Sequence, residues 1–61
     1  MNHDEHLEPE ILNETDNFGV WRSKEGDDVI YHVELGGVSL HFNSEEWEEF
    51  VVLIKGAAQA A

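Results

Sequence analysis

Residues 29–43 read V-I-Y-H-V-E-L-G-G-V-S-L-H-F-N and predict a β-hairpin that turns at Gly36-Gly37. A two-residue Gly-Gly loop suits a type I′ turn, because both central residues of that turn need a positive φ. Leu35 then pairs with Val38, and each earlier residue pairs with its mirror partner. This register decides which side chains share a face of the sheet.

The predicted pairing divides the hairpin into an apolar face and a more polar one. On the apolar face Val33 lies opposite Leu40, and Tyr31 lies opposite Phe42. The other face carries a pair of histidines among mixed neighbours: Ile30, His32, Glu34, Ser39, His41 and Asn43.

Residues 17–24 alternate in the same way and predict a further strand, with Phe18 and Val20 on the apolar side and Trp21 on the other. Residues 25–28, E-G-D-D, are typical of a turn, which is centred either on residues 25–26 or on residues 26–27. Both registers keep Phe18 and Val20 on the face of Tyr31.

Residues 43–46, N-S-E-E, resemble a capping box and predict a helix capped by Asn43. Gly56 is expected to end this helix, with residues 57–61 fraying or continuing weakly. Apolar residues at three- and four-residue spacing form a stripe expected to cover the apolar face of the sheet: Trp47, Phe50, Val51, Ile54 and Ala58. The predicted fold is α+β, a three-stranded antiparallel β-meander packed on one C-terminal α-helix in two layers (β-β-β-α).

The expected organisation is an acidic, largely flexible N-terminal tail over residues 1–16 and a single β-β-β-α domain over residues 17–61. In the tail, Pro9 is expected to open one helical turn that carries Ile11 and Leu12 toward the core. A chain of 61 residues buries only about 60% of the surface that its unfolded form exposes. We therefore expect a partner to contribute to stability.

Fourteen acidic residues against three basic ones give a net charge of −11, which opposes binding to phosphate backbones or anionic membranes. The acidity suits a surface adapted to high salt, a solubility tail, or a docking surface for a protein partner with a basic surface. No apolar run approaches the roughly 20 residues of a membrane span, and the acidic N-terminus is unlike a secretory signal. The expected location is cytoplasmic.

The composition also narrows the chemistry. The chain has no cysteine, which excludes a disulfide framework, a thiolate zinc site and thiol catalysis. There is no glycine-rich phosphate loop, and a flat two-layer sheet offers neither a substrate pocket nor an oxyanion hole. We expect no enzymatic activity and no cofactor.

The sheet face opposite the helix is too apolar for a solvated surface in so acidic a chain. Pairing with a second copy would hide this face and an unprotected strand edge together, so a homodimer is expected. The predicted interface combines this face with two helix residues outside the main stripe: Trp21, Ile30, His32, His41, Val52 and Leu53. Alternatively, the N-terminal tail folds over the face with Leu7, Ile11 and Leu12.

The paired histidines are also candidate metal ligands. His32 and His41 would lie about 5 Å apart at Cβ, with Glu34 diagonal to His41 as a third ligand, a donor set that suits zinc or nickel. Packing or a pH-responsive interface is the alternative role of the pair. Met1-Asn2-His3 is a second candidate, since a histidine at position three chelates Cu(II) or Ni(II) together with the amine and two amides.

Residues 36–54, G-G-V-S-L-H-F-N-S-E-E-W-E-E-F-V-V-L-I, resemble the last strand and helix of the PC4-like transcriptional coactivators. The positions that carry the resemblance are Gly37, Val38, Ser39, Leu40, Glu46 and Trp47. The resemblance implies dimerisation through sheet and helix, and binding of single-stranded DNA by basic and aromatic residues. Here the strands offer only Arg22 and Lys24, and the net charge opposes a phosphate ligand.

The sequence therefore leaves two hypotheses for the function. The leading hypothesis is a small acidic, non-enzymatic protein-protein interaction or regulatory module that self-associates through its sheet. The alternative is a single-strand nucleic-acid-binding, transcription-associated protein, in which Trp21, Tyr31 or Trp47 stacks on bases.

Overall fold

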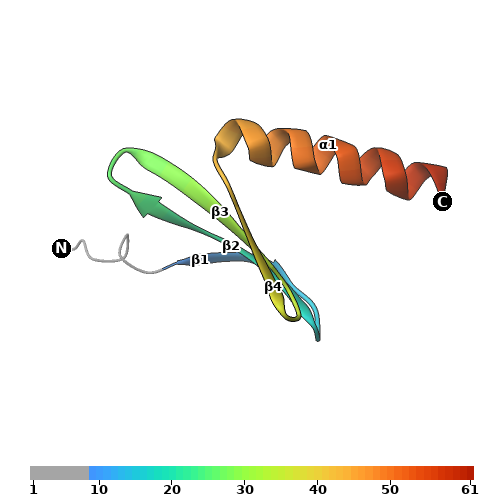
Figure 1. The fold of residues 1–61 in the computed structure, drawn as a ribbon, viewed down its shortest axis with the longest axis horizontal. Coiled ribbons are helices and arrows are strands. Elements are labelled where there is room, and N and C mark those ends of the chain that lie inside the picture. Colours follow the sequence, from blue (N-terminus) through green and yellow to red (C-terminus); the bar gives the residue numbers. More distant parts are fainter. Residues whose placement is uncertain (1–8) are drawn as a thin grey trace.

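The computed structural model describes residues 9–61, which form an antiparallel sheet followed by one helix (Figure 1). The elements are β1 (Glu10–Glu14), β2 (Phe18–Glu25), β3 (Asp28–Leu35), β4 (Val38–Phe42) and α1 (Ser44–Ala60). The strands lie in the order β1-β2-β3-β4, so each pairs with its neighbour in the chain. The predicted α+β class and β-meander are confirmed, but the sheet has four strands and not the predicted three.

Strand β1 is the element that the sequence did not predict, and it replaces the helical turn expected after Pro9. It pairs antiparallel with β2, and its register shifts between Ile11 and Asn13. That irregularity breaks the period of two, and all five residues of β1 are exposed, so no alternation marks the strand. Ile11 and Leu12, expected in the core, are 63% and 39% exposed.

Strand β1 lies inside the range predicted as a flexible tail. Residues 1–8 lie outside the described part of the chain, and so do the two predictions that depend on them. These are the copper or nickel chelate at Met1-Asn2-His3 and the covering role of Leu7.

The β3–β4 register is the one that the sequence predicts, and the β2–β3 register is one of the two that the sequence left open. Tyr31 pairs with Phe42, His32 with His41, and Val33 with Leu40. Glu25 pairs with Asp28, so the β2–β3 loop consists of residues 26–27, the second of the two predicted registers.

The β3–β4 turn differs from the predicted type I′. Gly36 has a φ of 68°, but Gly37 does not have a positive φ, so only the first central residue is left-handed. This φ pattern is that of a type II′ turn, which closes the same two-residue hairpin. The pairing is therefore right even though the predicted turn type was wrong.

Helix α1 begins as predicted, with a complete capping box. The backbone N–H of Glu46 donates to Asn43 Oδ1 at 2.8 Å, and the backbone N–H of Asn43 donates to Glu46 Oε1 at 3.0 Å. Gly56 does not end the helix, which continues through the alanine-rich segment to Ala60.

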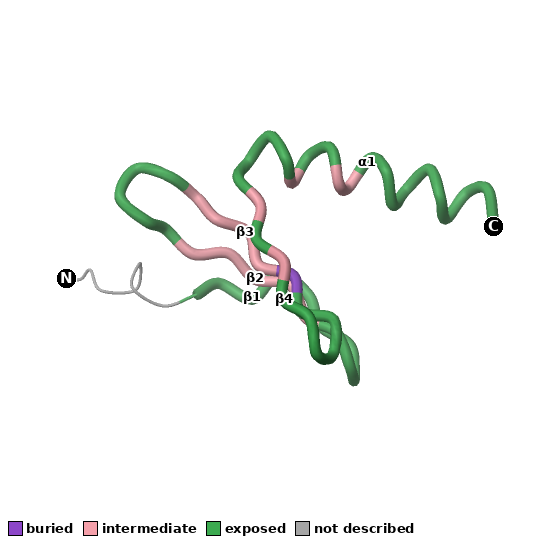
Figure 2. Tube along the Cα trace, in the orientation of Figure 1, coloured by how far each residue is buried: buried purple, intermediate pink, exposed green. Residues whose placement is uncertain are grey.

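The helix touches the sheet through its first turns. On the helix side of the sheet, which we call the inner face, Tyr31 stacks on Trp47 with ring centroids 4.8 Å apart, and Phe42 stacks on Phe50 at 4.9 Å. Within the described residues α1 contacts only β3 and β4, and its C-terminal half runs away from the sheet (Figure 1). Val33, 3% exposed, is the one buried residue among residues 9–61 (Figure 2).

The helical stripe therefore leaves part of the inner face open, contrary to prediction. Phe18, Leu35 and Val38 form one row across β2, β3 and β4. They are 54%, 37% and 54% exposed. The aromatic stacks hold α1 at the Phe42 end of the sheet, and this row lies at the opposite end of the strands. Ile54, a member of the predicted stripe, is 48% exposed.

Candidate interaction surfaces

The face of the sheet opposite the helix, the outer face, carries one row of side chains that crosses all four strands. Ile11 pairs with Trp21, Trp21 with His32, and His32 with His41. The Trp21 and His32 rings are stacked, with centroids 5.2 Å apart and planes within 6°. The His32 and His41 rings meet edge to face at 4.8 Å. We call Ile11, Trp21, His32 and His41 the outer row.

Ser23 holds His32 in place within this row. Its Oγ lies 2.8 Å from His32 Nε2, a hydrogen bond whose direction depends on the histidine tautomer. Neither Ser23 nor Ile11 was predicted as part of the site. Alternation already places Ser23 on the Trp21 side of β2, but Ile11 joins the row only through the pairing of β1, which no local pattern showed.

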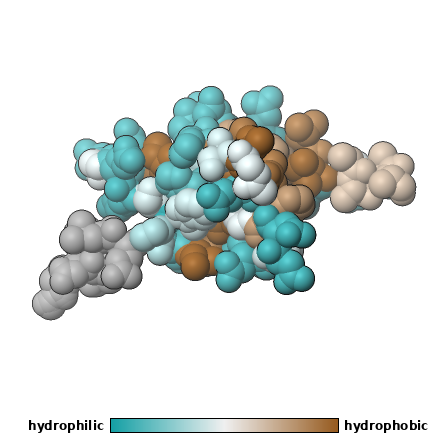
Figure 3. All heavy atoms as spheres, turned by 60° about the horizontal axis from the view of Figure 1, so that its bottom comes forward, coloured by the Kyte–Doolittle hydropathy of each residue, from teal (hydrophilic) through white to brown (hydrophobic). Residues whose placement is uncertain are grey.

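The predicted interface residues lie on two surfaces. Trp21, Ile30 and His32 are on the outer face and are half-buried by their neighbours, whereas His41 is exposed at the β4 end of the row. Val52 and Leu53 are on α1 and are 70% and 64% exposed. Figure 3 shows that apolar side chains gather on the surface of the molecule beside hydrophilic ones.

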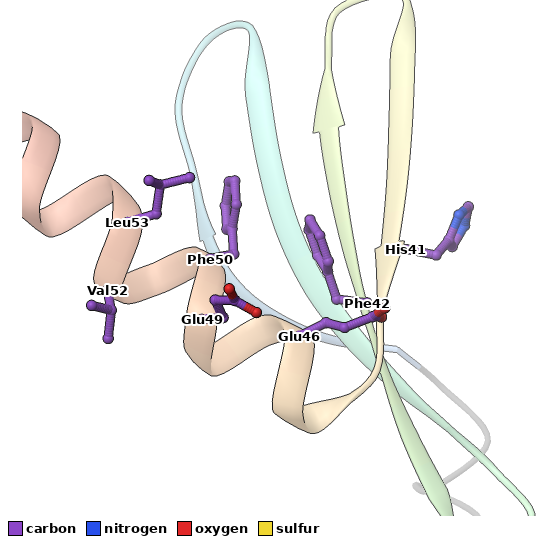
Figure 4. Close-up of a pocket in the computed structure, with 7 residues that line it drawn as sticks. All are labelled: His41, Phe42, Glu46, Glu49, Phe50, Val52 and Leu53. Carbon is purple, nitrogen blue, oxygen red and sulfur yellow. The ribbon is translucent and has the colours of Figure 1, made fainter.

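A groove beside β4 joins the helix residues to His41. It has a volume of about 530 Å³ and is lined by His41, Phe42, Glu46, Glu49, Phe50, Val52 and Leu53. In Figure 4, Phe42 and Phe50 lie side by side between strand and helix, and His41 points to the other side of β4. His41 therefore belongs to both surfaces: it ends the outer row and borders the groove.

The two edges of the sheet differ in their protection. Strand β1 carries a register shift and two glutamates, Glu10 and Glu14, features that discourage the addition of another strand. Strand β4, V-S-L-H-F, contains no lysine, acidic residue or proline, and its pairing with β3 is regular. Within residues 9–61 no strand pairs with the free edge of β4, which can therefore accept a further strand.

The histidine pair forms as predicted, but it does not gain a third ligand. Among residues 9–61, no group of three or more histidine, aspartate or glutamate side chains is placed to hold a metal ion. In addition, His32 Nε2 is already engaged by Ser23. Metal binding by His32, His41 and Glu34 stays a prediction, and it would need a ligand from outside the described residues.

An ion pair links the β1 edge to the inner face. Arg22 Nε donates to Glu10 Oε1 at 2.7 Å. The hydrogen bond to Glu10 raises the pKa of Arg22 above its ordinary value, and a hydrogen bond to Tyr31 adds to the effect. One of the three basic residues of the chain is thus committed to an internal carboxylate.

Comparison with protein-family models, curated proteins and solved structures finds no match to this chain. Within the described residues, α1 is not long and apolar enough to cross a membrane.

Proposed function

We propose that this chain is a small acidic, non-enzymatic interaction module that self-associates through the outer face of its sheet. The observation that supports this best is the outer row, a stacked tryptophan and two histidines that no described element covers. The row extends across all four strands, and such an extended surface suits another protein better than a small substrate.

A single protomer buries little apolar surface, and self-association would bury more of it. Val33 alone is buried among the described residues, so a single copy has almost no core. Burying Trp21 and Ile30 more fully contributes up to about 1.5–3 kcal/mol for each side chain. A two-fold axis through the outer row brings the same residues together from both copies, as an isologous interface requires.

The surroundings of the row fit this role. Glu14 and Glu34 are exposed on the outer face beside the half-buried aromatic centre. A polar rim around an apolar centre is the usual anatomy of a protein interface. In the described part of the chain, Ile11 lies beside Trp21 in the row, so β1 widens the outer face and does not cover it.

Molar mass by light scattering on a sizing column, at low and at near-molar salt, tests the proposal. We expect a dimer that tightens at high salt, because salt screens the repulsion between two copies of charge −11. Trp21→Ala and His41→Glu should shift the chain toward the monomer. His41 is exposed in the protomer, so its variant should still fold, which circular dichroism checks.

Val38→Ser is the matched control, because Val38 is an exposed apolar residue on the inner face. This variant should stay dimeric. A monomer at both salt concentrations would overturn self-association. A dimer that Val38→Ser dissociates and Trp21→Ala leaves intact would overturn the choice of the outer face.

Nucleic-acid binding remains the alternative prediction, but no observation favours it over self-association. Tyr31 and Trp47 stack on each other, and Trp21 stacks on His32, so each has one ring face already in contact. Arg22 is paired with Glu10. These side chains would have to exchange internal contacts for bases and phosphates, against a net charge of −11.

A further inference from the structure

We propose that the groove beside β4 binds an extended, basic segment of another protein, which adds to the sheet as a strand along the β4 edge. Lysine or arginine side chains of that segment would lie between Phe42 and Phe50 and reach Glu46 and Glu49. This surface is separate from the outer row apart from His41, and the proposal does not depend on self-association.

The free edge of β4 offers backbone groups that can pair with an added strand. Leu35 and Val38 flank a two-residue loop, and the next pair is Glu34 with Ser39. Antiparallel pairs alternate between those that exchange hydrogen bonds and those whose backbone groups point away from each other. Since the pair flanking such a loop exchanges hydrogen bonds, Ser39 and His41 direct their backbone N–H and C=O groups toward the open edge. An added strand would satisfy them.

The groove provides a place for the side chains of an added strand. Successive side chains of a strand point to opposite faces. One set would therefore enter the groove, over the stacked rings of Phe42 and Phe50 and the exposed Leu53, and the other set would lie near His41 (Figure 4). A groove of about 530 Å³ can hold several such side chains.

The negative charge of the groove favours a basic occupant. Glu46 and Glu49 line it, so an aliphatic stem that ends in a cation matches both its apolar floor and its acidic wall. Lysine or arginine also gains from contact with an aromatic ring. A second copy of this chain fits less well, because it brings the same glutamates and only three basic residues. The outer row contains no carboxylate and is the better surface for self-association, which leaves the groove for a basic partner.

The test uses a short synthetic peptide of alternating lysine and valine as the probe, titrated into the full chain and followed by NMR at physiological salt. We expect saturable one-to-one binding, with shifts concentrated in the backbone amides of β4 and in the groove-lining turns of α1. A peptide of identical sequence and charge, N-methylated at alternate residues so that it cannot pair along an edge, should bind about tenfold more weakly.

Two charge-matched variants separate the groove from general attraction to an acidic chain. Glu49→Gln should weaken binding about two- to fivefold. Glu25→Gln, an exposed carboxylate at the end of β2 and outside the groove, should change it little. Equal binding of the two peptides would overturn strand addition, and equal effects of the two variants would overturn the groove.

The outcome can be read independently of self-association. The peptide should bind the Trp21→Ala variant as it binds the wild type, whether or not that variant is monomeric. Loss of the dimer with intact peptide binding would leave this proposal standing. A stable dimer that binds neither peptide would refute the groove proposal alone.

Discussion

Gly36 carries the backbone conformation on which the β3–β4 hairpin depends. Its φ of 68° lies in the left-handed region, which costs a residue with a Cβ atom roughly 1–2 kcal/mol. Gly37 has no such φ, and a Cβ atom added at either position meets nothing within 4 Å. The two glycines therefore differ in backbone conformation and not in available space.

We predict that Gly36→Ala lowers the free energy of unfolding by about 1–2 kcal/mol, because of the two glycines in this turn only Gly36 has a φ that strains a residue with a Cβ. Gly37→Ala should be neutral or stabilising by up to about 1 kcal/mol, since it reduces the freedom of the unfolded chain. Urea denaturation of both variants at one protein concentration measures the difference. Equal losses at the two positions would show that the left-handed φ of Gly36 does not explain the requirement for glycine.

At the scale of elements, helix α1 depends on its first turns. Its described contacts with the sheet include the stacking of Trp47 on Tyr31 and of Phe50 on Phe42, one and two turns after the cap. Asn43 both ends the connection from β4 and caps the helix. Loosening the cap therefore disturbs the part of the helix that attaches it to the sheet.

We predict that Asn43→Ala lowers stability by about 1 kcal/mol, because the backbone N–H of Glu46 loses its acceptor. Asn43→Asp should stay near the wild type, since a carboxylate caps equally well and is favoured by the helix dipole. Gln59→Ala, at the far end of the helix, is the control. Circular dichroism during chemical denaturation follows all three. A loss with Gln59→Ala as large as with Asn43→Ala would contradict the role given to the cap.

At the scale of the whole molecule, a large charge accompanies a very small core. The chain has fourteen acidic residues and three basic ones, and its described part buries one residue. Repulsion among the carboxylates opposes the compact state, and little burial is present to offset it. The stability of the molecule should therefore depend strongly on ionic strength, as it does in a protein adapted to high salt.

We predict that the melting temperature rises by several degrees between low and near-molar KCl, because the screening length falls from about 10 Å at 0.1 M to about 3 Å at 1 M. A variant with Glu25→Gln and Glu48→Gln should show a smaller rise, because it carries less charge to screen. Thermal melts at fixed protein concentration measure both. A rise that is unchanged in this variant would show that charge repulsion is not what salt relieves.

Much of the fold follows from local patterns. Alternation in residues 18–24 and 29–42 predicts which side chains share a face, and the Gly36-Gly37 loop predicts the pairing of β3 with β4. The His32–His41 pair follows from the predicted β3–β4 register, whereas the pairing of Trp21 with His32 required the structure to select one of two β2–β3 registers. The groove residues Phe42, Glu46 and Phe50 did not appear as a site in the sequence, because the groove exists only through the angle between helix and sheet.

The sequence alone determined the α+β class, the register of β3 with β4, the face that each side chain of β2 takes, and the start of the helix. Each depends on neighbours along the chain: side-chain alternation, a two-residue loop, and a cap that binds the backbone three residues ahead. Only the tertiary structure decided that β1 joins the sheet, that the stacks at Tyr31 and Phe42 hold α1 at one end, and that the row from Phe18 to Val38 stays open. These features depend on contacts between segments that are distant in the sequence. Each such contact forms only if its packing energy exceeds the chain entropy that it costs, and a local sequence pattern does not show that balance.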